Sequence, residues 1–169
     1  AAVRVNRLAA NRTYYYRFIE FFNHDVSPIG ETRTFSNSEL STLKLGVASC
    51  ANYEAGYFNV YQEMANSDID LVIHLGDYIY ENGKNGFGSD NALGLNRIHN
   101  PETELYTIED YRMRYKQYRG DENLKLLHQK KPFICIWDDH EISDNAYKNG
   151  AAGHQESEGS FEARKQVAS

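Results

Sequence analysis

The residues with the clearest chemical potential are the acids and the histidine that directly follow an apolar run at 132–136. The segment 137–141 reads WDDHE, which places Asp138, Asp139, His140 and Glu141 side by side. Carboxylates bind cations through oxygen, and one carboxylate can bridge two cations that share a substrate oxygen. An imidazole beside such cations can protonate a leaving oxygen. This combination is typical of phosphate ester hydrolysis, in which stabilisation of negative charge does most of the catalysis.

Two earlier apolar runs also end in residues that can bind metal. The run 43–49 is followed by Cys50, and the run 68–76 is followed by Asp77 and, three residues later, by Tyr80. A thiolate and a phenolate are anionic donors that favour a trivalent or borderline ion such as iron, whereas carboxylate oxygens suit calcium or magnesium. The three groups therefore offer ligands for two kinds of cation.

Helical patterns separate these apolar runs. Thr107 and Asp110 have the spacing of a capping box before a helix that runs through 108–119, and a further helix is predicted at 122–129. An earlier helix near 57–66 is predicted by four residues that share one helical face: Tyr57, Val60, Tyr61 and Met64.

Apolar strands that alternate with helices predict a parallel α/β sheet. The strands at 43–49, 68–76 and 132–136 are continuously apolar, which predicts that both faces of the sheet are covered. Ligands bind beyond the carboxyl ends of parallel strands, so the three groups of candidate ligands are expected to meet at one edge. The connection at 76–107 is too long to be idle in a compact domain.

The first part of the chain has a different character. Residues 13–22, TYYYRFIEFF, are dense in β-branched and aromatic residues and lead into turn-forming residues before 31–35. We interpret residues 1–36 as the C-terminal part of a small β-domain, with a polar linker at 36–42 and an α/β domain at 43–169. Only three strands of that α/β domain are present, and the tail ends in the predicted start of a helix.

Composition excludes several classes of protein. The net charge of −6 disfavours nucleic-acid binding, although the basic and tyrosine-rich segment 111–120 leaves open a face for single strands beside the interpretation as a partly packed helix. No apolar stretch has the length of a membrane span. Two cysteines are too few for a disulfide framework; they can pair, stay inert or bind metal. The sequence does not indicate an oligomeric state.

Each candidate also has a structural interpretation. Asp77 can be a turn residue, Tyr80 a packing residue, and Cys50 a small buried hydrophobe, as Cys135 is expected to be. His74, inside an apolar strand, is expected to be a core histidine. Asp138 and Glu141 are interpreted as supports for the loop that carries Asp139 and His140. The convergence of the groups, and no single residue, favours a site.

The motifs SC (49–50), GDYIYE (76–81) and WDDHE (137–141), in this order and spacing, resemble the catalytic domain of PhoD-type alkaline phosphatases, members of the purple acid phosphatase-like metallophosphoesterases. Residues 1–35 resemble the fibronectin- or immunoglobulin-like β-sandwich that precedes this domain. Leu8 and Tyr14 keep the spacing of its tyrosine corner, although Ala10 stands where proline is common.

The resemblance implies specific roles. Cys50, Asp77 and Tyr80 would bind Fe3+, Asp77 would bridge to Ca2+, Asp139 would bind on the calcium side, and His140 would contact the phosphate and assist the leaving group. The implied protein is an exported phosphodiesterase or monoesterase that acts on small or polymeric phosphate esters, with its remaining ligands on later strands. A non-catalytic β-sandwich module with a degenerate α/β domain, or a hydrolase of another bond, is the alternative.

Overall fold

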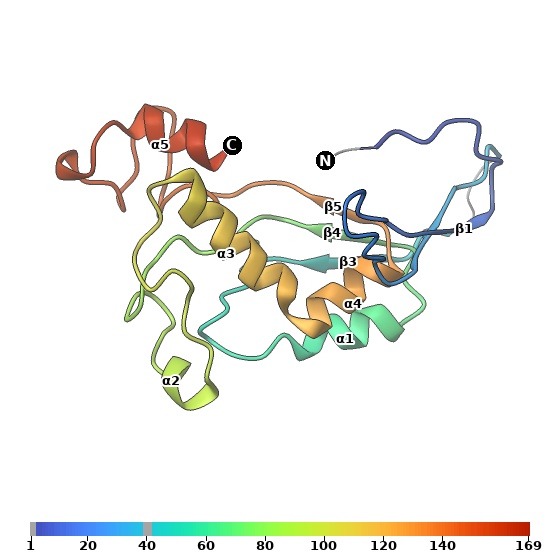
Figure 1. Ribbon diagram of the computed structural model, residues 1–169, viewed down its shortest axis with the longest axis horizontal. Helices are drawn as coiled ribbons and strands as arrows, with labels where there is room; N and C mark the ends of the chain where they lie inside the picture. Colours follow the sequence, from blue (N-terminus) through green and yellow to red (C-terminus); the bar gives the residue numbers. More distant parts are fainter. Residues whose placement is uncertain (1–2, 39–41) are drawn as a thin grey trace.

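A computed structural model describes residues 3–38 and 42–169, which form two sheets and a set of helices (Figure 1). The first sheet is an antiparallel pair of β1 (Thr13–Tyr16) and β2 (Gly30–Arg33). The second is a three-stranded parallel sheet in the order β3 (Leu45–Ala48), β4 (Leu71–His74), β5 (Phe133–Cys135). The predicted mixed α/β class with a parallel sheet is confirmed, whereas the predicted linker at 36–42 includes residues outside the described ranges.

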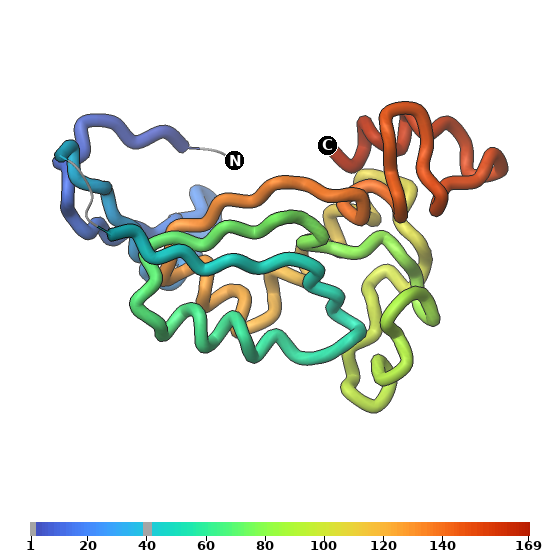
Figure 2. The backbone as a smooth tube through the Cα atoms, turned by 180° about the vertical axis from the view of Figure 1, so that it is seen from behind, coloured from blue at the N-terminus to red at the C-terminus, as the bar shows by residue number. Residues whose placement is uncertain are grey.

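Three helices cover one face of the parallel sheet: α1 (Asn59–Asn66), α3 (Ile108–Gly120) and α4 (Glu122–Lys130). In Figure 1, α3 crosses in front of the strands, and α4 and α1 lie along their lower side; Figure 2 shows the sheet from behind. The core between these layers includes Val72, Tyr61 and Leu124, with no more than 2% of each side chain exposed. The helices therefore fix the sheet from one side and leave its carboxyl edge to the loops.

The prediction that both faces of the sheet are covered is wrong for the described residues. Alternate strand residues point away from the helices and are about half exposed, namely Leu45, Val47, Ile134 and Ile136. Successive side chains of a strand point to opposite faces, so a continuous apolar run shows that both faces are apolar without showing what covers the second one.

The predicted face of the first helix is also corrected. The helix begins at Asn59, so Tyr57 precedes it, and both Tyr57 and Val60 are exposed. Tyr61 and Ala65 are buried and Met64 packs against the core, together with Phe58 at the N-cap. Of the four residues in the predicted set, Tyr61 and Met64 face the core, whereas Tyr57 precedes the helix and Val60 lies on its exposed side.

Helix α3 begins as predicted. The Thr107 hydroxyl accepts a hydrogen bond from the Asp110 N–H, and the Asp110 carboxylate accepts one from the Thr107 N–H, which completes the capping box. Tyr111, Arg114 and Tyr118 form its buried face. The interpretation of segment 111–120 as a partly packed helix is therefore confirmed, and its central arginine is unavailable to nucleic acid.

The strand predicted at 13–22 is shorter in the structure, where it forms a hairpin with β2. Strand β1 stops at Tyr16, and the aromatic residues beyond it lead into a turn with Phe21 and Phe22 more than 80% exposed. The Tyr14 hydroxyl accepts a hydrogen bond from the Ala9 N–H at 2.7 Å, which matches the predicted tyrosine corner. An ion pair between Arg33 and Asp70, at 2.6 Å, links the hairpin to the parallel sheet.

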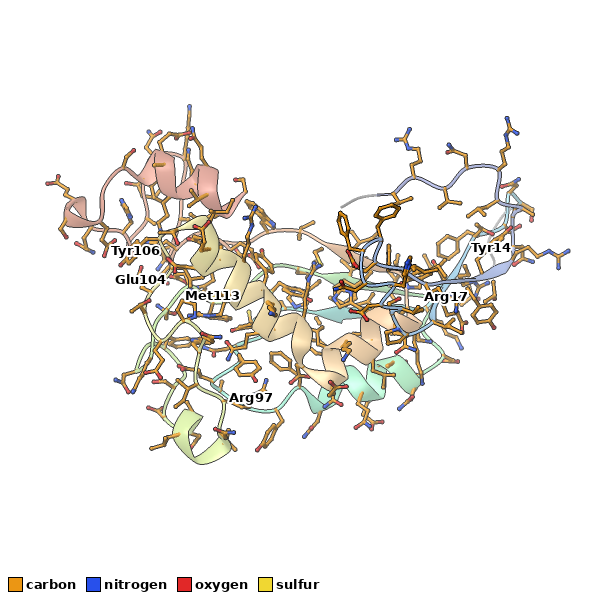
Figure 3. All side chains as sticks on the ribbon, in the orientation of Figure 1. Tyr14, Arg17, Arg97, Glu104, Tyr106 and Met113 are labelled. Carbon is orange, nitrogen blue, oxygen red and sulfur yellow. The ribbon has the colours of Figure 1, made fainter. Side chains whose placement is uncertain are left out.

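The connection at 76–107 and the C-terminal segment pack beyond the carboxyl ends of the strands. The connection contains a short helix, α2 (Ala92–Leu95). Helix α5 (Phe161–Ala168), preceded by the 3-10 turn η1 (Glu156–Glu158), is tied down by an ion pair from Arg164 to Glu104 at 2.7 Å; Glu104 and Tyr106 lie below α5 in Figure 3. Among the described residues, no helix is long and apolar enough to cross a membrane.

Candidate metal centre and active site

The three strands deliver the candidate ligand residues to one edge, as the topology predicts. The backbone pairing of β3 and β4 continues past the strands, because the Cys50 N–H donates to the Gly76 carbonyl and the Ala51 N–H donates to the Asp77 carbonyl. Cys50 and Asp77 have φ angles of 56° and 52°, in the left-handed region that is uncommon for residues other than glycine. Such conformations are concentrated at functional sites, where surrounding contacts stabilise them.

A glycine lets two of these loops touch. Gly76 has a φ of 104°, and a Cβ atom built on it would lie 2.4 Å from the Cβ of Asp138. Only glycine permits this close approach and this backbone conformation together. The loop after β4 can therefore pack directly on the loop after β5.

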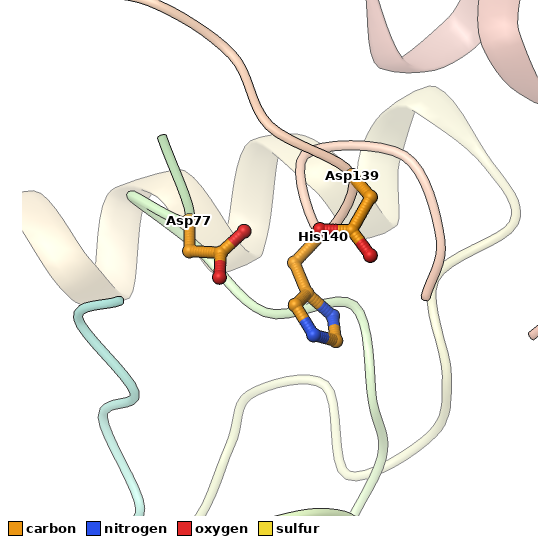
Figure 4. Close-up of side chains that lie close together, drawn as sticks. All are labelled: Asp77, Asp139 and His140. Atoms are coloured by element: carbon orange, nitrogen blue, oxygen red, sulfur yellow. The ribbon is translucent and has the colours of Figure 1, made fainter. Parts of the chain in front are cut away.

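Asp77, Asp139 and His140 converge at this contact. One potential ligand atom from each lies within 4.8 Å of the others, and Figure 4 shows the three side chains brought together from two segments of the chain. The Tyr80 hydroxyl donates to Asp77 Oδ2 at 3.2 Å. The other oxygen, Asp77 Oδ1, is buried and has no hydrogen-bond partner among the described residues.

The unpartnered oxygen is the clearest indication of a cation. A buried carboxylate oxygen without a partner is costly, and the same burial raises the pKa of Asp77, an effect that His140 and Cys50 oppose. A cation bound at Asp77 would satisfy Oδ1 and favour the ionised form. The oxygen-rich donor set therefore fits a metal ion.

The two soft or phenolic donors lie beside Asp77. The Cys50 thiol is free and exposed, and it interacts with the Asp77 carboxyl and the Tyr80 hydroxyl. Burial, followed by the charge of Asp77, raises the pKa of Tyr80 far above its usual range. Tyr80 would therefore ligate as a phenolate only with strong compensation from a cation. Cys135, expected to be buried, is instead exposed and free.

The predicted supports act in different ways. Glu141 is fully buried and accepts backbone hydrogen bonds from Asp77, at 3.0 Å, from Tyr78, and from Asp138, at 2.8 Å. It therefore ties the loop after β4 to the loop after β5. Asp138 contributes its backbone N–H and its contact with Gly76, while the residue itself is exposed.

His140 is held on two sides. Its Nδ1 lies 2.7 Å from Glu81 Oε2, and its ring stacks on Tyr80 with centroids 4.3 Å apart. Burial alone would lower the pKa of His140, but the hydrogen bond and charge of Glu81, together with Asp77 and Asp139, raise it to about 9. Beside the ring lies a cavity of about 330 Å³ whose lining includes Phe87 and Glu104.

Sequence reasoning counted Glu81 only among the metal-capable residues after the second strand and gave Arg114 no role, yet the structure places both next to the site. Glu81 follows the predicted ligand Tyr80 directly, and an acid in that position was the available signal. Arg114 is fully buried and donates to backbone carbonyls of the 76–107 connection, including Asn82 at 2.9 Å and Pro101 at 2.8 Å. Nothing in a basic helical segment distinguishes one buried arginine from its exposed neighbours.

Comparison with known proteins identifies the family of this chain. The model of the PhoD-like phosphatase family matches residues 45–169, which is most of the chain and all of the parallel sheet. The chain belongs to the PhoD-like phosphatase family. The resemblance inferred from the three motifs is thereby confirmed.

Individual members of the PhoD-like family show the same relation. The chain is 43% identical over 145 residues to alkaline phosphatase D of Bacillus subtilis (strain 168), a match that covers 85% of this chain and 24% of that protein. A solved structure described as PhoD superposes with a TM-score of 0.80 at 41% identity and covers 94% of this chain and 30% of the other. The chain thus spans less than a third of the length of these PhoD relatives.

Proposed function

We propose that the intact protein hydrolyses phosphate esters, both diesters and monoesters, at a metal centre held by Cys50, Asp77, Tyr80 and Asp139. The observation that carries this proposal is the convergence of Asp77, Asp139 and His140 around a buried carboxylate oxygen that has no partner. Membership in the PhoD-like family and the similarity to alkaline phosphatase D support the same activity.

The donor set suggests which ions bind. The thiol of Cys50 and the phenol of Tyr80 suit Fe3+, and the carboxylate oxygens of Asp77 and Asp139 suit Ca2+, with Asp77 shared between the two. When bound, such ions supply positive charge that stabilises the transferred phosphoryl group. Further ligands are expected from parts of the intact protein that this chain does not contain.

Glu141, Asp138 and His140 have separate roles in the proposed site. Glu141 keeps the two ligand loops in contact through three backbone hydrogen bonds, with Asp138 among the donors. His140 lies beside the ligand cluster and would contact the phosphate and pass a proton to the leaving oxygen. The cavity next to it has room for the group that leaves.

The resemblance extends the proposal in two directions. We propose that residues 1–36 belong to a fibronectin- or immunoglobulin-like β-sandwich and residues 43–169 to the first part of the catalytic α/β sandwich. We also propose that the protein acts outside the cytoplasm, in the periplasm, the cell wall or the medium. A degenerate binding module is disfavoured because such a domain should have lost some strand-end ligands, and Cys50, Asp77, Tyr80 and Asp139 are all present.

The test is Asp77→Asn in the intact protein, assayed with a p-nitrophenyl phosphodiester and, for another bond, with p-nitrophenyl acetate. Loss of the bridging carboxylate should lower phosphodiester hydrolysis about 10³-fold or more. Asp90→Asn, at an exposed aspartate of the 76–107 connection, is the matched control and should leave the rate unchanged. Retained activity of Asp77→Asn, or hydrolysis of the acetate alone, would contradict the proposal.

The identity of the ions has its own measurement. Elemental analysis of the intact protein should find iron and calcium, and a visible charge-transfer band should disappear in Tyr80→Phe. A colourless protein that lacks iron and is fully active would exclude the assignment of Cys50 and Tyr80 as iron ligands.

A further inference from the structure

Among the residues that the structure describes, Glu81 is the carboxylate that contacts the side chain of His140 at hydrogen-bond distance. Its side chain is 1% exposed, and both of its oxygens are engaged. Oε2 lies 2.7 Å from His140 Nδ1, and Oε1 accepts a hydrogen bond of 2.7 Å from the Asp144 N–H. A single buried carboxylate therefore holds the imidazole ring and the turn that follows it.

The second hold on the ring is aromatic. Tyr80 stacks on His140 with an angle of 28° between the rings, and Phe87 in turn stacks on Tyr80 with centroids 6.4 Å apart. The stacked rings restrict tilting of the imidazole, while Glu81 restricts its rotation about the Cβ–Cγ bond. Together they leave His140 one orientation.

That orientation frees one nitrogen. Because Nδ1 donates to Glu81, the Nε2 atom is the one available to a substrate. The nearest acidic group to Nε2 is Asp144 Oδ1 at 3.8 Å, which is beyond hydrogen-bond distance. His140 and Asp144 both line the cavity of about 330 Å³, so a ligand in that cavity would meet an imidazole with an unused nitrogen.

Glu141 provides a useful contrast inside the same site. It is as deeply buried as Glu81, but its recorded hydrogen bonds are all from backbone N–H groups and none is from His140. Its geometry supports the loops, whereas the geometry of Glu81 acts on one side chain.

We infer that Glu81 is a positioning residue for His140, which fixes the Nδ1–H tautomer and presents Nε2 to the leaving group of the substrate. The inference rests on the proposed function of His140. A partner that orients a functional histidine commonly contributes 10- to 100-fold to activity. The contribution of Glu81 should therefore depend on the presence of the imidazole.

A double-mutant cycle in the intact protein tests this dependence. With a p-nitrophenyl phosphodiester, Glu81→Gln should lower kcat about 10- to 100-fold with little change in KM or in metal content. In the His140→Ala background, the same change should have less than a roughly 3-fold further effect, because coupled residues are not additive. Equal fold-losses in both backgrounds, or loss of metal from Glu81→Gln, would overturn the inference.

A second measurement does not depend on activity and also covers the case in which Glu81→Gln fails to fold. In metal-free protein with ¹⁵N-labelled histidine, measured above pH 9 where the His140 ring is neutral, the His140 resonances, identified by their absence in His140→Ala, should show a proton held on Nδ1. A neutral ring with its proton on Nε2 and a free Nδ1 would overturn the inference. If this tautomer is found but Asp77→Asn stays active, the proposed function fails while the positioning by Glu81 stands.

The matched control is Glu54→Gln, which changes another buried glutamate that also faces a histidine but lies outside the ligand cluster. It should leave the His140 resonances unchanged and should have the same effect on kcat whether or not His140 is present. A coupling to His140 as large as that of Glu81 would show that the cycle reports general destabilisation, and it would count against the inference.

Discussion

Two buried glutamate–histidine pairs in this chain have opposite properties. Glu81 and His140 lie 2.7 Å apart beside the candidate ligands, and Glu54 and His99 lie 3.6 Å apart where the loop after β3 packs on the 76–107 connection. Both glutamates are 1% exposed. The His140 side chain is 12% exposed, whereas that of His99 is completely buried.

The surroundings of each pair account for the difference. His99 has a pKa lowered to about 3, first by burial and then by the charge of Arg114. His140 has its pKa raised to about 9, because Glu81, Asp77 and Asp139 outweigh the effect of burial. The histidine of the pair is thus kept neutral where it is fully buried near arginines and is charged where acids surround it.

The core pair belongs to a network that shapes the connection. Glu54 accepts from the His99 N–H at 2.8 Å, and His99 Nε2 contacts the Tyr118 hydroxyl at 3.1 Å. Arg97 forms an ion pair with Asp121 at 2.9 Å and lies 3.6 Å from the centre of the Tyr53 ring. This network joins Tyr53 and Glu54 to the later part of the 76–107 connection and to the C-terminal end of α3.

The largest effect on stability should come from breaking the core pair. Glu54→Ala leaves the His99 N–H and nearby arginine charge without their buried partner, which should lower the free energy of unfolding by about 3–5 kcal/mol. Denaturant unfolding of the intact protein measures this, with exposed Glu63→Ala as the control near zero. A loss below about 1 kcal/mol would show that the pair is not a structural support.

The second-largest effect on stability should come from protonation of the core histidines at low pH. Burial lowers the pKa of His74 and of His128 to about 4, below the value of about 6.5 expected when unfolded. Because the pKa of each histidine is lower in the folded state, its contribution to the free energy of unfolding is complete above pH 6.5 and is lost as the pH falls toward 4. At pH 5 each should cost about 2 kcal/mol of stability relative to pH 8.

Unfolding experiments at pH 8 and pH 5 measure this cost. His128→Gln should reduce the difference between the two pH values by about 2 kcal/mol. An unchanged difference would mean that His128 is already protonated at pH 5 in the folded protein. The pKa of this core histidine would then be closer to that of His140.

The smallest effect is expected from an exposed pair on the same connection. Lys84 and Glu102 lie 2.9 Å apart with side chains that are 51% and 60% exposed. A double-mutant cycle with Lys84→Ala and Glu102→Ala should give a coupling below about 1 kcal/mol. A coupling as large as the loss in Glu54→Ala would mean that burial does not set the strength of the charged pairs here.

The sequence was sufficient for features that depend on local patterns or on topology. The capping box at Thr107, the order of strands and helices, and the arrival of Asp77, Asp139 and His140 at one edge all follow from spacing and from the rules of parallel sheets. The boundary of α1 and the exposed face of the sheet did not follow, because they depend on which neighbours are present. The partner of His140 also needed coordinates, since Glu81 is 59 residues away.

The contact between Gly76 and Asp138 has a consequence for how this site could change. The loops after β4 and β5, which carry the proposed ligands Asp77 and Asp139, touch through main chain and Cβ atoms, with no adjustable side chain between them. The backbone therefore sets the distance between the carboxylates of Asp77 and Asp139. The loops cannot move closer together. A change in preference between small and large cations would therefore require a change in side-chain length at the proposed ligands, such as glutamate in place of aspartate.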